Sequence, residues 1–326
     1  MAPNWRGLSS SLSNRRTRLV AVSVPEGLDH SAPSGAISVI RYRAVVSYDG
    51  TDFLGFQSQE HADREVRTVQ SVLQVGLSQV IGRRISIVGA GRTDAGVHAS
   101  GQVIHFECAS TRQMSTAQLE RALNAVLPRD LRVFGLVVVS DGFHARFSAT
   151  RRSYRYVIDN GRYAHPQRRR YAWHVASVLD ISAMRAACLE LVGLHDFVAF
   201  AAREASGPTV RRVYRADVIE IATHDAEALL GDRIREMWHN KGYVERDSAS
   251  SGRVIWIEVE ANAFLRHMMR RIVGSLVRVG RGWMPPAEVG ELLRSRVKAD
   301  AGPAAPAHGL DLFHIAYGDT NTVDQD

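Results

Sequence analysis

The chain has 326 residues, of which 45% are hydrophobic and 23% charged. This composition is ordinary for a globular protein, and the length is sufficient for two domains or one large one. No apolar run reaches the length of a membrane span and no signal-peptide segment is seen, so we expect no membrane partner. The net charge of +7, from 41 Lys and Arg against 34 Asp and Glu, permits a nucleic-acid partner without indicating one.

The cysteines, histidines and lysines add weaker constraints. Cys108 and Cys188 lie in apolar periodic segments without metal-ligand spacing, which is typical of core thiols and of a protein from the reducing cytoplasm. The histidines show no ligand spacing, so we expect no metal. The only lysines are Lys241 and Lys298, so the basic charge is almost all arginine. Arginine suits phosphates and bases, but the same bias can reflect genome composition.

The first 37 residues show no clear periodicity. They carry four arginines among Ser, Gly and Pro, which predicts a disordered basic arm. Such an arm either adds phosphate contacts or is an inert tail.

The first predicted elements are a strand over 40–48 and a helix from an N-cap at Thr68 to Gly82. The loop between them holds Phe53, Phe56 and Gln57. Loops rarely carry aromatic residues unless these pack or stack. The two phenylalanines either pin the loop to the core or serve a binding site.

Residues 89–102 form the most informative stretch. Four glycines surround Arg92 and Asp94, and apolar runs at 85–88 and 103–106 flank them. We interpret this stretch as a loop joining two strands. Glycine permits positive φ and the close approach of backbone or ligand. The residues alone leave two readings open, namely a functional site or a glycine-rich turn with a surface Arg–Asp pair.

The next elements complete one β-α-β-β-α-β unit. Strands are expected over 85–89 and 102–107, a helix from the capping box of Ser115 and Gln118 to Pro128, and a strand over 132–140. This order predicts an α+β, ferredoxin-like plan, in which both helices cover one face of an antiparallel sheet.

A second unit repeats that order, with a boundary near 145–152. Its expected strands lie over 152–158, 210–221, 254–260 and 312–317. Its expected helices run over 181–192, from an N-cap at Asn262 to Gly280, and over 286–294. A basic loop with a short strand is expected over 163–175. We therefore predict two halves, 38–148 and 149–320. The second half carries a polar insertion at 223–252 whose function cannot be inferred.

Two segments of the second half combine cations with apolar residues. In 151–156, tyrosines alternate with arginines, so Tyr154 and Tyr156 share one strand face and Arg155 takes the other. This pattern fits stacking on bases, and it equally fits an ordinary half-buried strand. In 262–274, Arg266 and Arg270 are one turn apart among core-spaced apolar residues.

These segments resemble the tRNA pseudouridine synthase A family. Its signature G-R-T-D-x-G-V-H-A-x-x-Q is complete here from Gly91 to Gln102. The segments at 48–57, 152–156, 262–270, 193–200 and 309–312 are also similar to family segments, the last two as architecture. The resemblance covers roughly 40–318 and implies a pseudouridine synthase fold built of two ferredoxin-like halves with a catalytic cleft between them.

The resemblance also implies roles for individual residues. Asp94 would be the catalytic carboxylate, Tyr154 would stack on the target base, and Arg270 would be the ion partner of Asp94. The implied substrate-binding residues are Arg92, Thr93, His98, Gln102, Phe53, Gln57, Tyr156 and Arg266.

The activity implied is isomerisation of uridine to pseudouridine at positions 38, 39 and 40 in the anticodon stem-loop of tRNA. A flipped uridine would meet one aspartate, acting as nucleophile or as base, with no cofactor. A homodimer is implied by the resemblance alone. The alternatives are a pseudouridine synthase for another RNA or site, a non-catalytic RNA-binding protein, and an N-glycosidase. The last is disfavoured because no second carboxylate lies in the loop, although Asp49 and Asp52 could lie near.

Overall fold

The computed structural model describes residues 39–58, 66–109, 114–202, 207–221, 252–296 and 301–318. The predicted arm at 1–37 and the predicted insertion at 223–252, apart from its last residue, lie outside these ranges. The first half of the chain contributes β1 (Val39–Tyr48), α1 (Val69–Ile81), β2 (Ile87–Gly89), β3 (His98–Ala109), α2 (Thr116–Val126) and β4 (Leu131–Val139). A short 3₁₀ turn (Gly50–Asp52) follows β1.

The second half contributes more elements in a similar order. They are β5 (Ala149–Asn160), β6 (Trp173–His174), α3 (Ile181–Leu189), β7 (Gly193–Asp196), β8 (Val210–Ile221), β9 (Arg253–Ala261), α6 (Met268–Gly280), α7 (Glu288–Ser295) and β10 (Leu310–Tyr317). Two further 3₁₀ turns lie at Val198–Phe200 and Ala307–Gly309.

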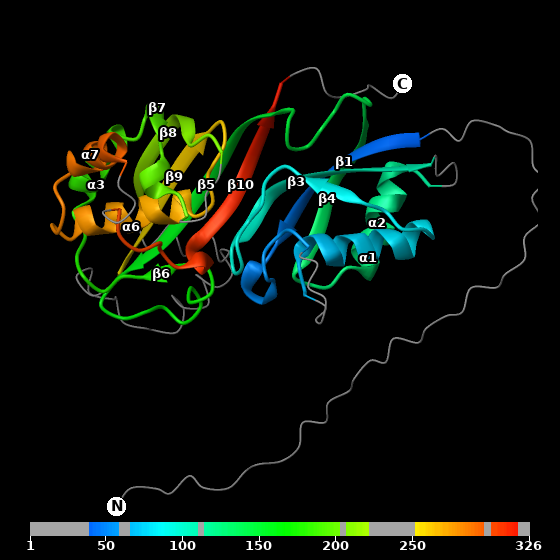
Figure 1. The fold of residues 1–326 in the computed structure, drawn as a ribbon. Coiled ribbons are helices and arrows are strands. Elements are labelled where there is room, and N and C mark those ends of the chain that lie inside the picture. Colours follow the sequence, from blue (N-terminus) through cyan, green and yellow to red (C-terminus); the bar gives the residue numbers. More distant parts are fainter. Residues whose placement is uncertain are drawn as a thin grey trace, which may run out of the picture. The chain divides into compact units, whose positions relative to one another are not determined.

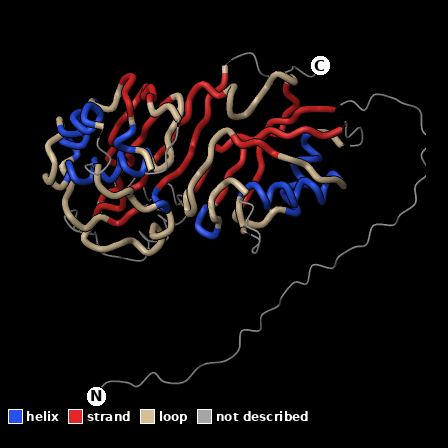
Figure 2. Tube along the Cα trace, viewed as in Figure 1, coloured by secondary structure: helices blue, strands red, loops and turns tan. Residues whose placement is uncertain are grey.

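The strands of the described residues all belong to one sheet, and with the helices they make a mixed α+β fold. Its main path runs β4-β1-β3-β10-β5-β9-β8-β7, with β2 paired to β3 and β6 paired to β5. Figure 2 shows this sheet in red, with the helices in two groups. In Figure 1, α1 and α2 lie together near β1 and β4, whereas α3, α6 and α7 gather near β8 and β9.

The two halves of the sheet meet where β3 runs parallel to β10. His98 is opposite Asp311 and Ala99 is opposite Leu312. The Asp311 carboxylate accepts hydrogen bonds from the Ser100 amide at 2.7 Å and the Ser100 hydroxyl at 2.6 Å. Gly101 allows this approach, because a Cβ there would lie 2.0 Å from the Phe313 carbonyl oxygen.

Local sequence signals account for the helix ends of the first half. Thr68 and Ser115 each form a capping box with the residue three positions on, which satisfies amides at the start of α1 and α2. Gly82 ends α1 in the left-handed region with φ of 80°. Leu73 and Leu77 of α1 are fully buried, as expected for the apolar face of a helix that covers a sheet.

The structure corrects three predicted boundaries. Asn262 does not cap a helix, because its Oδ1 accepts from the amides of Arg212 and Ala263 and ties the end of β9 to β8. The helix begins only at Met268. The helix expected to Val192 ends at Leu189. The loop expected over 89–102 is shorter, since β3 already begins at His98 and extends along both β1 and β10.

Candidate active site

The loop that carries Asp94 connects β2 to β3 and is held by its own sequence. The buried Gln102 side chain donates to the Gly91 carbonyl at 2.9 Å and accepts from the Gly91 amide at 3.3 Å. Gly96 turns the chain with φ of 76°. The two Gln102 contacts hold Gly91, at the start of the loop and three residues before Asp94.

Residues before the first helix support the loop from the other side. The Phe56 amide donates to the Thr93 carbonyl at 3.1 Å. A Cβ at Gly55 would lie 2.9 Å from that same carbonyl oxygen. The buried Thr93 hydroxyl and the Tyr48 hydroxyl are hydrogen-bonded at 2.7 Å. Burial raises the pKa of Tyr48 above its usual range, so this hydroxyl stays protonated and uncharged.

Three basic side chains from the second half surround the Asp94 carboxylate. Arg270 Nη1 donates to Asp94 Oδ2 at 3.5 Å, His267 Nε2 lies 3.5 Å from the same oxygen, and Arg266 Nε lies 4.0 Å from Oδ1. The Asp94 side chain keeps 27% of its surface exposed. The carboxylate is therefore both held by cations and open to a substrate.

The start of α6 brings these residues to Asp94. Arg270 lies in its first turn, and its Nε donates to the Ala305 carbonyl at 2.7 Å, which directs the guanidinium. The N-terminus of a helix carries a partial positive charge that favours a nearby carboxylate. The arrangement joins a loop of the first half to a helix of the second.

Tyr154 lies beside this group on β5. Its ring packs edge-on against Phe264 with 4.8 Å between centroids, and 7% of the residue is exposed. Burial, with added repulsion from Tyr48 and Asp94, raises the pKa of Tyr154 above its usual range. The ring is thus an apolar, uncharged surface near the carboxylate.

Tyr156 has a structural position. It is fully buried, and its hydroxyl donates to the Pro306 carbonyl at 2.8 Å. Tyr154 and Tyr156 share a face, as predicted. Arg155 takes the opposite face, where it stacks on Trp256 at 3.8 Å and pairs with Glu258.

His98 joins the two halves and lies apart from the carboxylate. Its Nδ1 accepts from the Gly50 amide at 3.0 Å, and its Nε2 lies 3.0 Å from the Arg170 carbonyl oxygen. Asp49 lies beside it and accepts from the Tyr171 hydroxyl at 2.8 Å. Partial burial acts to raise the pKa of Asp49, but hydrogen bonds from Thr51 and Tyr171 outweigh it and the pKa is lowered.

Three further predicted substrate-binding residues also lie outside the group of Arg266, His267 and Arg270 around Asp94. Arg92 and Gln57 are exposed side chains. Phe53 is buried, with the Arg67 guanidinium 4.0 Å from its ring centroid. This position matches the alternative reading in which the phenylalanine pins its loop to the core.

The residue that sequence reasoning missed is His267. It stands between Arg266 and Arg270, in a segment where helical spacing predicts a continuous helix. Its φ of 64° instead places it in a turn immediately before α6. Burial, reinforced by repulsion from Arg270, Arg266 and Arg271, lowers the pKa of His267 despite the attraction of Asp94. Its imidazole is therefore neutral at pH 7.

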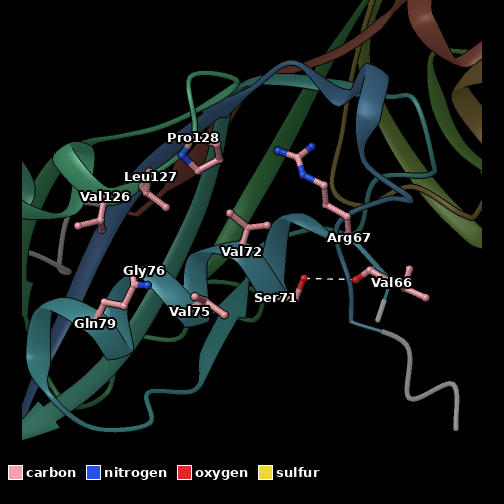
Figure 3. Close-up of a pocket in the computed structure, with 10 residues that line it drawn as sticks. All are labelled: Val66, Arg67, Ser71, Val72, Val75, Gly76, Gln79, Val126, Leu127 and Pro128. Carbon is pink, nitrogen blue, oxygen red and sulfur yellow. Dashed lines mark hydrogen bonds between the residues drawn. The ribbon is translucent and has the colours of Figure 1, made fainter. Parts of the chain in front are cut away.

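A separate pocket of about 410 Å³ lies between α1 and the residues that follow α2. Figure 3 shows apolar side chains of both, including Val72 and Leu127, with Arg67 at one end. None of the residues around Asp94 lines it.

The described ranges contain no group of three or more His, Cys, Asp or Glu side chains able to hold a metal ion, and no helix in them is long and apolar enough to cross a membrane. The expected absence of a metal stays a prediction for the whole chain.

Comparison with known proteins relates most of the chain to one family. The family model for tRNA pseudouridine synthase matches residues 44–148 and 187–318. A tRNA pseudouridine synthase A of Chloroflexus aurantiacus is 43% identical over 274 residues, which are 84% of this chain and 87% of that protein. Proteins with the same name from Brevibacillus brevis and Syntrophotalea carbinolica are 40% and 37% identical, over 85% and 86% of this chain and 99% and 98% of their own lengths. By sequence and across most of its length, this chain belongs to the tRNA pseudouridine synthase family.

Proposed function

We propose that this chain converts uridine to pseudouridine in tRNA with Asp94 as its catalytic group. The activity follows from family membership, which makes the chain a tRNA-modifying isomerase. One observation carries the role of Asp94. Its carboxylate is partly exposed and lies within 4.0 Å of Arg266, His267 and Arg270. Such a group is held in place by its neighbours while a neutral base and a ribose dock beside it.

The reaction needs one carboxylate and no redox partner. The N1–C1′ bond of uridine breaks, the uracil rotates, and C5 bonds to C1′. The proton on C5 is lost and N1 gains one, so atoms and charge balance. Asp94 acts either as a nucleophile or as the base at the sugar. Hydrolysis of a glycoside ordinarily uses two carboxylates. Asp49, one of the two other carboxylates that the sequence suggested, is engaged by Thr51 and Tyr171.

The target uridine reaches Asp94 by leaving its stack, at a cost of a few kcal/mol. Tyr154 stacks on the flipped base, and the exposed Arg92 contacts a phosphate or fills the vacated space. Arg266 and Gln57 contact the RNA as well. Thr93, His98 and Gln102 act through the loop, because their side chains bond to the protein around it. Phe53 and Tyr156 support the site from the core.

Each half is a ferredoxin-like unit, and the catalytic cleft lies between the two. The strand orders support this. The first half has the order β4-β1-β3-β2, and the second half has the order β10-β5-β9-β8. In each half the fourth strand therefore lies beside the first, followed by the third and the second. The halves cover 38–148 and 149–320. The enzyme is a cytoplasmic homodimer that needs no cofactor and modifies positions 38, 39 and 40 of the anticodon stem-loop.

The test uses tRNA transcripts that carry a single anticodon-arm uridine, placed at 38, 39 or 40. Chemical mapping of pseudouridine after incubation with the enzyme should show modification in all three and none in a transcript with cytidine at each site. Modification only elsewhere in the tRNA, or only in another RNA, would favour the alternative pseudouridine synthase. Tight binding of all the transcripts without product would favour an RNA-binding protein.

A further inference from the structure

A short turn between β4 and β5 is held from several sides. The His144 amide donates to the Ser148 hydroxyl at 3.0 Å, and the Ser148 amide donates to the His144 carbonyl at 2.9 Å. The His144 imidazole Nδ1 accepts from the amides of Arg146 and Phe147, both at 3.2 Å. Ala145 is fully buried, and side chains of β3 and β10 bond to its amide and its carbonyl. The turn from His144 to Ser148 therefore has a fixed shape.

This turn presents an aromatic ring to solvent. Phe147 is 77% exposed, so its ring adds little to the core. A single exposed apolar side chain is ordinary by itself. Here, however, the ring stacks on the His144 imidazole, with 4.3 Å between centroids and 27° between planes. The Arg146 guanidinium carbon lies 5.6 Å from the centroid of the Phe147 ring. An aromatic ring beside an arginine suits the bases and phosphates of single-stranded RNA.

The turn borders the catalytic group. The same nitrogen of Arg152, Nη2, donates to the Arg146 carbonyl at 2.6 Å and to the Ala90 carbonyl at 3.2 Å. Ala90 lies at the start of the loop that carries Asp94. Arg152 is two residues before Tyr154 on β5, so the two side chains share one face of the strand. A nucleotide next to the target uridine therefore lies within reach of the turn.

We propose that Phe147 stacks on an unpaired base next to the target uridine, and that Arg146 contacts a phosphate of the same stretch. This role rests on the proposed function of the chain. A uridine that leaves its stack to reach Asp94 deprives each neighbouring base of one stacking partner. The Phe147 ring replaces that partner, and the charge of Arg146 favours the approach of the RNA backbone. Phe147 does not touch the reacting atoms, so it is a substrate-binding residue.

The first experiment compares three replacements of Phe147 in pseudouridine formation on tRNA. Alanine and leucine remove the aromatic face, whereas tyrosine keeps it. We expect F147A and F147L to raise KM on the order of 5–150-fold, the range for the loss of one stacked base, with kcat unchanged. F147Y should match the wild type. Thermal unfolding should be similar for all four proteins, because the side chain is exposed.

The control is W283A, which removes a similar pair elsewhere. Trp283 is 67% exposed, and the Arg281 guanidinium carbon lies 4.6 Å from its ring centroid. The pair lies beyond the C-terminal end of α6, whose 13 residues extend ~20 Å from the end beside Asp94. W283A should change neither KM nor kcat.

A second experiment identifies the stacked base. The wild type and F147A are bound to tRNAs that each lack one base of the anticodon arm. At one position beside the target, removal of the base should weaken wild-type binding as much as F147A does, and it should have no further effect on F147A. R146Q should lower the salt dependence of log Kd by about one phosphate, whereas F147A should leave that slope unchanged.

Several results would overturn the proposal. They are a wild-type KM in F147A, a wild-type KM in F147L, and additive losses at every abasic position. If F147A loses self-association in sedimentation and its weaker binding follows from that loss, the ring instead belongs to a contact between two copies of the chain. In each case a wild type that makes pseudouridine in tRNA leaves the proposed function standing. A wild type that makes none overturns the proposed function, and the binding of the abasic tRNAs still tests Phe147.

Discussion

Replacing Arg270 with lysine tests how the carboxylate is held. The guanidinium spans two acceptors, the Ala305 carbonyl at 2.7 Å and Asp94 Oδ2 at 3.5 Å. A lysine ammonium keeps the charge but lacks the planar fork, so it can serve one acceptor well and the other poorly. The R270K enzyme should therefore keep its fold and lose part of the orientation of Asp94.

The expected magnitude follows from the geometry. At 3.5 Å and an effective dielectric constant of about 20, the attraction between two unit charges is ~5 kcal/mol, an upper bound because both side chains are partly solvated. The loss of one hydrogen bond between charged groups costs ~1.5–3 kcal/mol. R270K should thus lower kcat/KM on the order of 10–150-fold, and R270A should lower it further.

The assay is single-turnover pseudouridine formation, which isolates chemistry from product release. The control is R281K, at the end of the same helix and ~16 Å along its axis from Arg270. Arg281 donates to the Ser177 hydroxyl at 2.9 Å, so that variant also loses an arginine hydrogen bond. If R270K turns over as fast as R281K while both remain folded, the planar fork of Arg270 does not orient Asp94.

Two predictions concern stability. Gly101→Ala should lower the free energy of unfolding by ~3 kcal/mol or more, because the new Cβ would lie 2.0 Å from the Phe313 carbonyl oxygen. The control in urea unfolding is Gly142→Ala, whose Cβ meets nothing within 4 Å. Equal unfolding midpoints for the two variants would contradict the close approach at Gly101. Burial lowers the pKa of His105 to about 4, and its Nδ1 accepts from the Ala145 amide at 3.1 Å. Between pH 6.5 and about 4, the unfolded chain binds a proton at His105 that the folded chain does not. The free energy of unfolding therefore falls as the pH drops through this range, by at most ~3 kcal/mol. His105→Gln should flatten that part of the stability curve, and an unchanged slope would show that other groups cause the acid sensitivity.

Local signals in the sequence predicted most of the elements. The caps at Thr68 and Ser115 and the left-handed Gly82 depend only on neighbouring residues, and they are confirmed. The alternation in β9 correctly placed Ile255 and Ile257 on a buried face. The pairing of β3 with β10 could not be predicted. It consists of two residue pairs whose members lie 213 positions apart along the chain, and so short a pairing leaves no periodic signal in the sequence.

Site residues could be predicted where they belong to a recognisable motif. They could not be predicted where their position depends on a turn of the backbone. The family resemblance brought Asp94 and Arg270 together, and the structure places them in contact. Helical spacing hid His267, because apolar residues on both sides of it continue the period while the chain itself makes a turn. Asn262 does not cap α6, because its Oδ1 accepts a hydrogen bond from the Arg212 amide of β8.

Tritium release from tRNA labelled at uridine C5 tests the central role of Asp94 most directly. Asp94→Asn keeps the size of the side chain and removes its charge, so tRNA binding should persist. The wild type should release tritium and Asp94→Asn should release none above background, with bound tRNA comparable in both. Substantial release by Asp94→Asn would contradict the assignment of Asp94 as the catalytic group.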